Sequence, residues 1–253
     1  MKPAVILALA LSAALSAADV KDVNRTVSLN GNGLVELETH KGSIRVSTWD
    51  RAEVEIQARI EAESGTIMDR RRFDGTEVRI DSSPDSVHIR TYYPDFAWCC
   101  SGDENGSNPE VRYTIRMPKT ARLTIRDHRS DTEVTGLQGA LDLFTHRGSA
   151  RVHGLGGALR VDTHRGDIQV DFSSFTANSS VTTYRGTIDL SMPKSSRFDL
   201  EADLGRRGGI DTDFTMMSRT IGRRGESMHG TVNGGGPALS IKAERGEVRI
   251  HAR

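Results

Sequence analysis

The feature that most constrains the fold is a four-residue phrase that returns at a nearly constant interval. Its close copies are Thr145–Gly148, Thr163–Gly166 and Thr183–Gly186, each reading Thr, a His or Tyr, Arg and Gly. Counted from Ser130 at the end of an earlier, looser copy, the successive intervals are 18, 18 and 20 residues. A period of this length is typical of stacked repeats, in which each unit buries its apolar edge only against its neighbours.

Looser copies of the phrase are Thr39–Gly42, Asp127–Ser130 and Ala243–Gly246. Short runs of alternating apolar and polar residues flank the copies, whereas helical periodicity is absent beyond the first residues. We therefore predict an all-β, parallel β-solenoid (β-helix-like) with strand–turn repeats of about 18–20 residues. Because strand residues alternate between faces, equivalent apolar positions should form one core: Leu141, Leu143, Leu159, Val161, Ile168, Val170, Ile188 and Leu190.

The amino-terminal part is less regular. We predict a β-hairpin across residues 82–85, between the alternating runs at 78–80 and 87–89. The charged residues 61–74 fit either a loop or a short helix. Residues 19–253 are expected to form a single domain, with 92–109 as an aromatic and cysteine-containing loop and 111–253 as the regular repeats.

The chain starts with the parts of a secretory signal peptide. Lys2 precedes an apolar stretch from Ala4 to Leu15, and small residues follow up to Ala18. We predict cleavage after Ala18 and export to the periplasm or the extracellular space. The apolar stretch is shorter than the roughly 20 residues that span a bilayer, and no transmembrane segment is expected in the mature chain.

The charge balance argues against a nucleic-acid partner. Without residues 1–18, the chain has 33 basic and 34 acidic residues, a net charge of about −1. Nucleic-acid-binding domains usually have a strong basic excess. Any preference for an anionic partner must therefore come from local clustering of charge.

The predicted loop holds Tyr92, Tyr93, Phe96 and Trp98, followed by Cys99 and Cys100. Adjacent Cα atoms lie about 3.8 Å apart, below the usual disulfide range of about 4.4–6.8 Å, so a bond between these cysteines would be strained. Three roles are open for the loop. It caps one end of the stack, its aromatic side chains contact a sugar or protein partner, or the cysteines are redox-active.

Two segments resemble a known family. They are Val111–Pro118, which leads into the repeats, and Val232–Pro237, which precedes the last one. Both are similar to segments of the bacterial putative-adhesin family, a β-strand-repeat group of exported proteins also called domain of unknown function 4097. The resemblance covers 111–250 well and the amino-terminal part loosely. It implies an exported envelope protein with an adhesin-like, structural or sensing role, and the family has no established catalytic residues to carry over.

The turn residues form the main candidate site. Outward strand positions pair opposite charges, with Glu133 beside Arg151 and Asp142 beside Arg160, but the turn column repeats one sign. Either this column is a solvated edge, partly neutralised by Asp131 and Asp167, or it binds an anionic glycan or phosphate polymer, because arginine pairs carboxylates and phosphates bidentately. The candidate residues are Lys41, His128, Arg129, His146, Arg147, His164, Arg165, Arg185 and Arg245.

Other chemistries find less support. A metal site in the histidine row lacks recurring Asp, Glu or Cys partners, and Tyr184 interrupts the row. No G-x-S-x-G motif is present, and no pair of carboxylates can be placed across one groove as glycoside hydrolysis requires. We therefore predict a non-enzymatic protein without a cofactor, whose partner is an anionic glycan or a cell-envelope protein. The alternative is a β-helix polysaccharide lyase or hydrolase.

Overall fold

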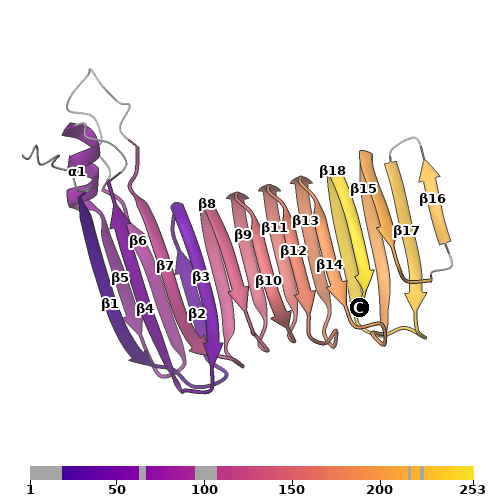
Figure 1. The fold of residues 1–253 in the computed structure, drawn as a ribbon, viewed down its shortest axis with the longest axis horizontal. Helices are drawn as coiled ribbons and strands as arrows, with labels where there is room; N and C mark the ends of the chain where they lie inside the picture. Colours follow the sequence, from indigo (N-terminus) through magenta and orange to yellow (C-terminus); the bar gives the residue numbers. More distant parts are fainter. Residues whose placement is uncertain (1–18, 63–66, 95–106, 216–217, 223–224) are drawn as a thin grey trace, which may run out of the picture.

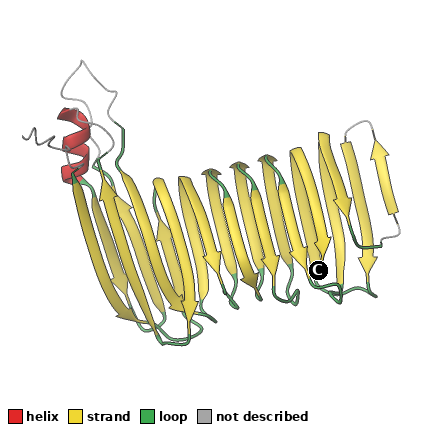
Figure 2. Cartoon of the chain, viewed as in Figure 1, coloured by secondary structure: helices red, strands yellow, loops and turns green. Residues whose placement is uncertain are grey.

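A computed structural model describes residues 19–62, 67–94, 107–215, 218–222 and 225–253 of the chain (Figure 1). The predicted signal peptide, Phe96, Trp98 and both cysteines lie outside the described residues. Most of the described residues are in strands, which stand side by side along the long axis of the molecule (Figure 2). The structure confirms the predicted all-β, parallel solenoid-like architecture.

The strands form two layers with the apolar core between them. The first layer contains, in order of pairing, β5 (Glu77–Ser82), β6 (Ser86–Tyr92), β2 (Leu34–Glu38), β8 (Arg122–Thr135), β9 (Leu141–Arg147), β11 (Leu159–Arg165), β13 (Ser179–Arg185), β18 (Ala238–Ala252), β15 (Phe198–Thr212), β17 (Gly225–Val232) and β16 (Ser218–Gly222).

The second layer contains, again in order of pairing, β1 (Val20–Ser28), β4 (Glu53–Glu61), β7 (Glu110–Pro118), β3 (Lys41–Trp49), the end of β8, β10 (Ala150–Leu155), β12 (Ile168–Phe172), β14 (Ile188–Met192) and the ends of β18 and β15. The long strands β8, β15 and β18 bend at the corner and pass from one layer into the other. Each coil is therefore one first-layer strand, a corner and one second-layer strand.

The repeat register agrees with the sequence prediction. Leu143 pairs with Ile125 on one side and Val161 on the other, so equivalent apolar residues face the same interior. All eight predicted core residues are at most 2% exposed. Because successive coils stack in register, a single continuous core runs the length of the molecule.

The order of stacking differs from the order along the chain. The carboxy-terminal strand β18 lies between β13 and β15, as the yellow ribbon in Figure 1 shows. Likewise, β2 and β3 lie next to β8, with β4–β7 on their other side. Segments far apart in sequence thus become neighbours at the same corner.

The amino-terminal end carries the predicted hairpin and one helix. Strands β5 and β6 pair antiparallel, which confirms the predicted hairpin. The charged segment, for which the sequence allowed either a loop or a short helix, contains the helix α1 (Ile67–Gly75). The ammonium group of Lys21 on β1 donates hydrogen bonds of 2.7 and 2.8 Å to the carbonyls of Phe73 and Asp74. Phe73 is buried against the core. In the described part of the chain, no helix is long and apolar enough to cross a membrane.

Candidate functional site

The repeated phrase forms the corner at which each coil passes from the first layer to the second. Its arginine is the last residue of β9, β11 and β13, and its glycine has a positive φ, for example 137° at Gly148 and 149° at Gly186. Residues other than glycine rarely adopt such angles. The glycine therefore fixes the corner, and the two residues before it in each of these coils, a His or Tyr and an Arg, emerge at the same edge.

The basic side chains at this edge form a continuous column across six coils, which we call the cationic edge. Each member pairs with the next in the parallel register, at the strand spacing of about 4.8 Å. The column reads Lys41, Arg129, Arg147, Arg165, Arg185 and Arg245. The structure thus brings together all the basic residues that the sequence placed in one candidate site.

The four central arginines of this edge, Arg129 to Arg185, are exposed, and their guanidinium groups have no ion pair or hydrogen bond with another described residue. The two ends differ. Lys41 lies 3.6 Å from a carboxylate oxygen of Glu110, and the guanidinium of Arg245 lies over the ring of Tyr184, 5.6 Å from its centroid. Like charges at neighbouring positions repel, so the centre of the edge is the part that an anion would stabilise most.

The turn aspartates form no ion pair with the four central arginines in the described part of the chain, and their carboxylates bind the neighbouring turns. Asp131 accepts hydrogen bonds from the backbone N–H (2.9 Å) and the hydroxyl (2.7 Å) of Ser149 in the next coil. Asp167 accepts one from the backbone N–H of Thr187 at 2.8 Å. The bonds from Ser149 hold the pKa of Asp131 below its usual range. Both carboxylates therefore link one turn to the next through hydrogen bonds.

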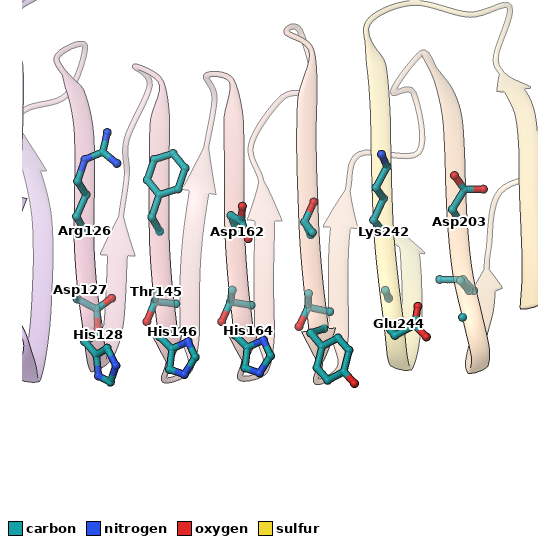
Figure 3. Close-up of a pocket in the computed structure, with 18 of the residues that line it drawn as sticks. Arg126, Asp127, His128, Thr145, His146, Asp162, His164, Asp203, Lys242 and Glu244 are labelled. Carbon is teal, nitrogen blue, oxygen red and sulfur yellow. The ribbon is translucent and has the colours of Figure 1, made fainter.

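The aromatic residues of the phrase form a second column beside the cationic edge, which we call the ring stack: His40, His128, His146, His164 and Tyr184. Figure 3 shows three of them, His128, His146 and His164, side by side on successive strands. Neighbouring ring centroids are 4.7–4.9 Å apart and all four contacts are stacked. Tyr184 interrupts the row of histidines, as the sequence shows, but its flat ring continues the stack. Tyr93 closes the other end, edge-on to His40 at 5.9 Å.

The surroundings of the ring stack favour neutral imidazoles. Burial, and after it the neighbouring His146 and the arginines at 147 and 129, lower the pKa of His128 below its ordinary value. Burial, His128 and Lys41 lower the pKa of His40 in the same way. The pKa of His164 is lowered as well. The neutral form of His128, His40 and His164 is therefore favoured, and the positive charge beside these three rings is that of the cationic edge.

Asp127 is a feature of the corner that the sequence analysis missed. It occupies the inward position held by Thr145 in the next coil. Burial raises its pKa to about 6, and the hydroxyls of Thr145 and Ser130 only partly offset this effect. The departure from Thr in an otherwise repeated position was the available signal. A carboxyl group that changes charge near neutrality thus lies directly behind His128.

A groove of about 1220 Å³ runs across the outer face of the first layer beside the ring stack. Figure 3 shows its two rows of side chains, with Arg126, Asp162, Lys242 and Asp203 in one and His128, His146, His164 and Glu244 in the other. No pattern in the sequence predicts this groove, because the residues of the first row do not share one sign of charge. Only the strand pairing places them together.

Ring faces near the groove are already occupied. Phe144 lies between the guanidinium groups of Arg126 and Arg160, at 4.7 and 5.3 Å from its centroid. Asp142 and Arg160 do pair in register, as predicted, but Arg160 extends over Phe144. These contacts leave Phe144 no open face for stacking against a sugar ring.

The members of the two outward charge pairs expected from the sequence lie opposite each other in the strand register, but one side chain of each pair contacts a different residue. Glu133 lies opposite Arg151 on one side, yet the side chain that its carboxylate approaches is Arg45 on the other side, at 3.8 Å. Both of these side chains are more than half exposed. Such a pair contributes little to stability.

The aromatic loop residues that the structure describes do not project together. Tyr92 is still part of β6 and is 40% exposed, with the guanidinium of Arg79 at 4.1 Å from its ring centroid. Tyr93 is half-buried, and its hydroxyl lies 3.5 Å from that of Thr39. A joint contact surface with Phe96 and Trp98 remains a prediction, since both of those residues lie outside the described part.

The rings of the histidine row do not converge on a common point where a metal ion could bind. Within the described ranges, no group of three or more His, Cys, Asp or Glu side chains is placed to hold a metal ion. Stacked imidazoles about 4.8 Å apart each present their edges to solvent, whereas a metal ion requires several nitrogen or oxygen atoms converging on one point.

Comparison with known proteins agrees with this architecture. The family model described as Toastrack DUF4097 matches residues 35–251. The chain is similar in fold to a putative cell adhesion protein from Clostridium sporogenes ATCC 15579, with a TM-score of 0.53 at 10% identity over 93% of this chain and 100% of the other. A putative adhesin from Bacteroides fragilis NCTC 9343 aligns at a TM-score of 0.39 and 11% identity over 92% and 97% of the two chains.

No curated protein matches this chain. The match to the family model spans both layers, from β2 to the last strand, and includes every residue of the cationic edge. The chain therefore belongs to the Toastrack DUF4097 family.

Proposed function

We propose that this chain is an exported, non-enzymatic envelope protein that binds anionic polymers along its cationic edge. The observation that carries the proposal is the column of four exposed arginines, Arg129 to Arg185, without an ion-pair partner among the described residues. Arginine presents a planar array of donors that matches carboxylate and phosphate groups. The signal-peptide pattern of residues 1–18 supports export.

The geometry favours a repeating anion over a single small one. The edge spans six coils, so its length is roughly 24 Å at a strand spacing of about 4.8 Å. Neighbouring charges lie well within the screening length of about 8 Å at physiological salt, so their repulsion is felt. A uronic-acid glycan or an envelope phosphate polymer offers one negative charge after another and relieves this repulsion along the whole column. The adhesin names of the similar structures agree with such a role.

The test is a titration of the mature protein with alginate, heparin and a neutral glucan at low salt. The variant Arg147→Glu with Arg165→Glu reverses the charge at the centre of the edge. Its matched control is Arg122→Glu with Arg197→Glu, which changes net charge equally but at the starts of β8 and β15, on the opposite edge of the first layer. Circular dichroism and thermal melting establish that all three proteins are folded.

The proposal requires that the wild type and the control bind alginate and heparin, and that this binding weakens as the salt concentration rises. The edge variant should bind at least about tenfold less tightly, because it has lost two charge-assisted contacts. If the wild type ignores both anions, or the edge variant binds them equally well, the edge is only solvated. Product release from the same polymers would instead support the enzymatic alternative, a lyase or hydrolase.

A further inference from the structure

The ring stack and the cationic edge are adjacent columns built from consecutive residues. His128, His146 and His164 each directly precede an arginine of the edge, and the corresponding histidine before Lys41 is His40. Their rings stack at 4.7–4.9 Å between centroids along the same axis as the arginines. An extended anion that lies on the arginines therefore passes beside four imidazoles, one in each of four successive coils.

Among the described residues, both basic and acidic groups surround the ring stack. The basic ones are the six residues of the cationic edge, together with Arg126 and Lys242 in the groove. The acidic ones are Glu110 near Lys41, Asp127 behind His128, Asp131 and Asp167 in the turns, and Glu38, Asp162, Asp203, Glu226 and Glu244 in the groove. Tyr93 and Tyr184 lie at the two ends of the stack. Of the acidic groups, Asp131 and Asp167 are bound to the neighbouring turn.

We propose that the ring stack makes anion binding proton-dependent: its histidines take up protons as the pH falls or as a polyanion binds, and each proton taken up strengthens the complex. This inference rests on the proposed function and specifies how the same site is regulated. A protonated imidazole donates through both ring nitrogens, so each proton adds a cationic donor beside an arginine that is already charged.

The direction of the effect follows from linkage. Burial, and after it the neighbouring histidines and basic residues, hold the pKa of His128, His40 and His164 down in the free protein. The part of this opposition to protonation that is electrostatic repulsion is removed by a bound anion. If binding favours proton uptake, proton uptake must favour binding by the same factor. Asp127 acts in the same sense, because its pKa is about 6 and its negative charge is lost as the solution is acidified below that value.

The experiment measures the affinity for dextran sulfate at fixed ionic strength from pH 8 to pH 5. Sulfate esters remain ionised throughout this range, so any change in affinity comes from the protein. The ring-stack variant carries three substitutions: His128→Tyr, His146→Tyr and His164→Tyr. The new side chains keep flat rings, as Tyr184 already does in the stack, but they cannot take up protons in this pH range. The matched control is His88→Tyr, His153→Tyr and His251→Tyr, whose histidines each lie beside a carboxylate away from the edge.

We expect the wild type and the control to bind about tenfold or more tightly at pH 5.5 than at pH 7.5, from one or two additional charge-assisted contacts. The ring-stack variant should keep its affinity at pH 7.5 and lose most of this increase. If the triple variant does not fold, His146→Gln should show a smaller loss in the same direction. As an independent measurement, NMR titration of the ring protons should show the pKa of the stack histidines rising when dextran sulfate is bound.

The outcomes separate this inference from the proposed function. Arginine-dependent binding that is equally tight at pH 7.5 and 5.5, or an increase that is undiminished in the ring-stack variant, overturns the inference and leaves the proposed function standing. No binding by the wild type at either pH overturns both. Histidine pKa values that do not move on binding also contradict the inference.

Discussion

A Cβ atom added to Gly166 would lie only 1.8 Å from the carbonyl oxygen of Gly148 in the preceding coil. The two corners are stacked backbone on backbone, and the space that a side chain needs is already filled. Gly166 also has a φ of 151°, which L-residues rarely adopt. The glycine of the repeated phrase is therefore required twice, once by the turn itself and once by the adjacent coil.

Gly166→Ala should lower the free energy of unfolding by about 2–5 kcal/mol, because the substitution combines an unfavourable φ with a backbone clash. Chemical denaturation measures the change. The matched control is Gly209→Ala, since no heavy atom lies within 4 Å of the position of its Cβ and its φ is not in the left-handed region. Equal stability of Gly166→Ala and the wild type would show that the corners are not stacked as described.

Val161→Asp should lower stability by about 3–5 kcal/mol, since it places an unpaired carboxylate in the core. Val161 is 1% exposed, between Leu143 and Val181 of the neighbouring coils. Gln169→Asp introduces the same group at an exposed position of β12 and should change stability by less than about 0.5 kcal/mol. Comparable urea midpoints for the two variants would argue against the buried column.

Asp127→Thr should stabilise the protein at neutral and higher pH. The folded pKa of Asp127 is about 6 against an ordinary value of 3.8, so between these values the folded state binds more protons than the unfolded state. Stability contributed by this group is therefore present at low pH and is lost as the pH rises through about 6. Replacement by the Thr of the neighbouring coils removes the loss, a gain on the order of 2 kcal/mol at pH 8.

The measurement for Asp127 is a comparison of unfolding free energies at pH 8, 6 and 4. The difference between Asp127→Thr and the wild type should shrink steadily and vanish near pH 4. Asp162→Thr serves as the control, because Asp162 is exposed in the groove and its replacement should have little effect at any pH. A stability gain that is independent of pH would show that Asp127 is not the titrating group.

Replacing both Cys99 and Cys100 with Ser should leave the thermal midpoint nearly unchanged. A bond between adjacent residues closes almost no loop, so it removes little entropy from the unfolded chain. Differential scanning calorimetry, with and without reductant, checks this expectation. A large decrease in the midpoint would reveal a structural disulfide, which would have to join two chains.

The cationic edge shows how far reasoning from the sequence reaches. Arg147 and Arg165 occupy equivalent positions in copies 18 residues apart, and in-register stacking of such copies necessarily aligns them. Asp127 and the groove were not predictable in this way. Asp127 breaks the repeat instead of following it, and the groove residues come from strands whose outward positions differ in every coil.

The contact of His40 with the ring stack was likewise not predictable from the sequence. This residue stacks on His128, 88 residues later in the chain, and the similarity of their phrases indicates that both lie at corners but not that the corners touch. The extension of the stack from three rings to five depends on this contact and on the flat ring of Tyr184.

The coil could be predicted from the residues alone: two short strands joined by a glycine corner, an apolar inward face, and one basic residue at each corner. These properties are local, since they depend on side-chain alternation and on the few residues of one turn. Which coil lies on which follows only from the strand pairing in three dimensions, which places β18 between β13 and β15. Parallel strands pair through backbone hydrogen bonds that are nearly independent of sequence, and the inward faces of the coils are almost interchangeable. The order of stacking is therefore set by how the whole chain closes on itself.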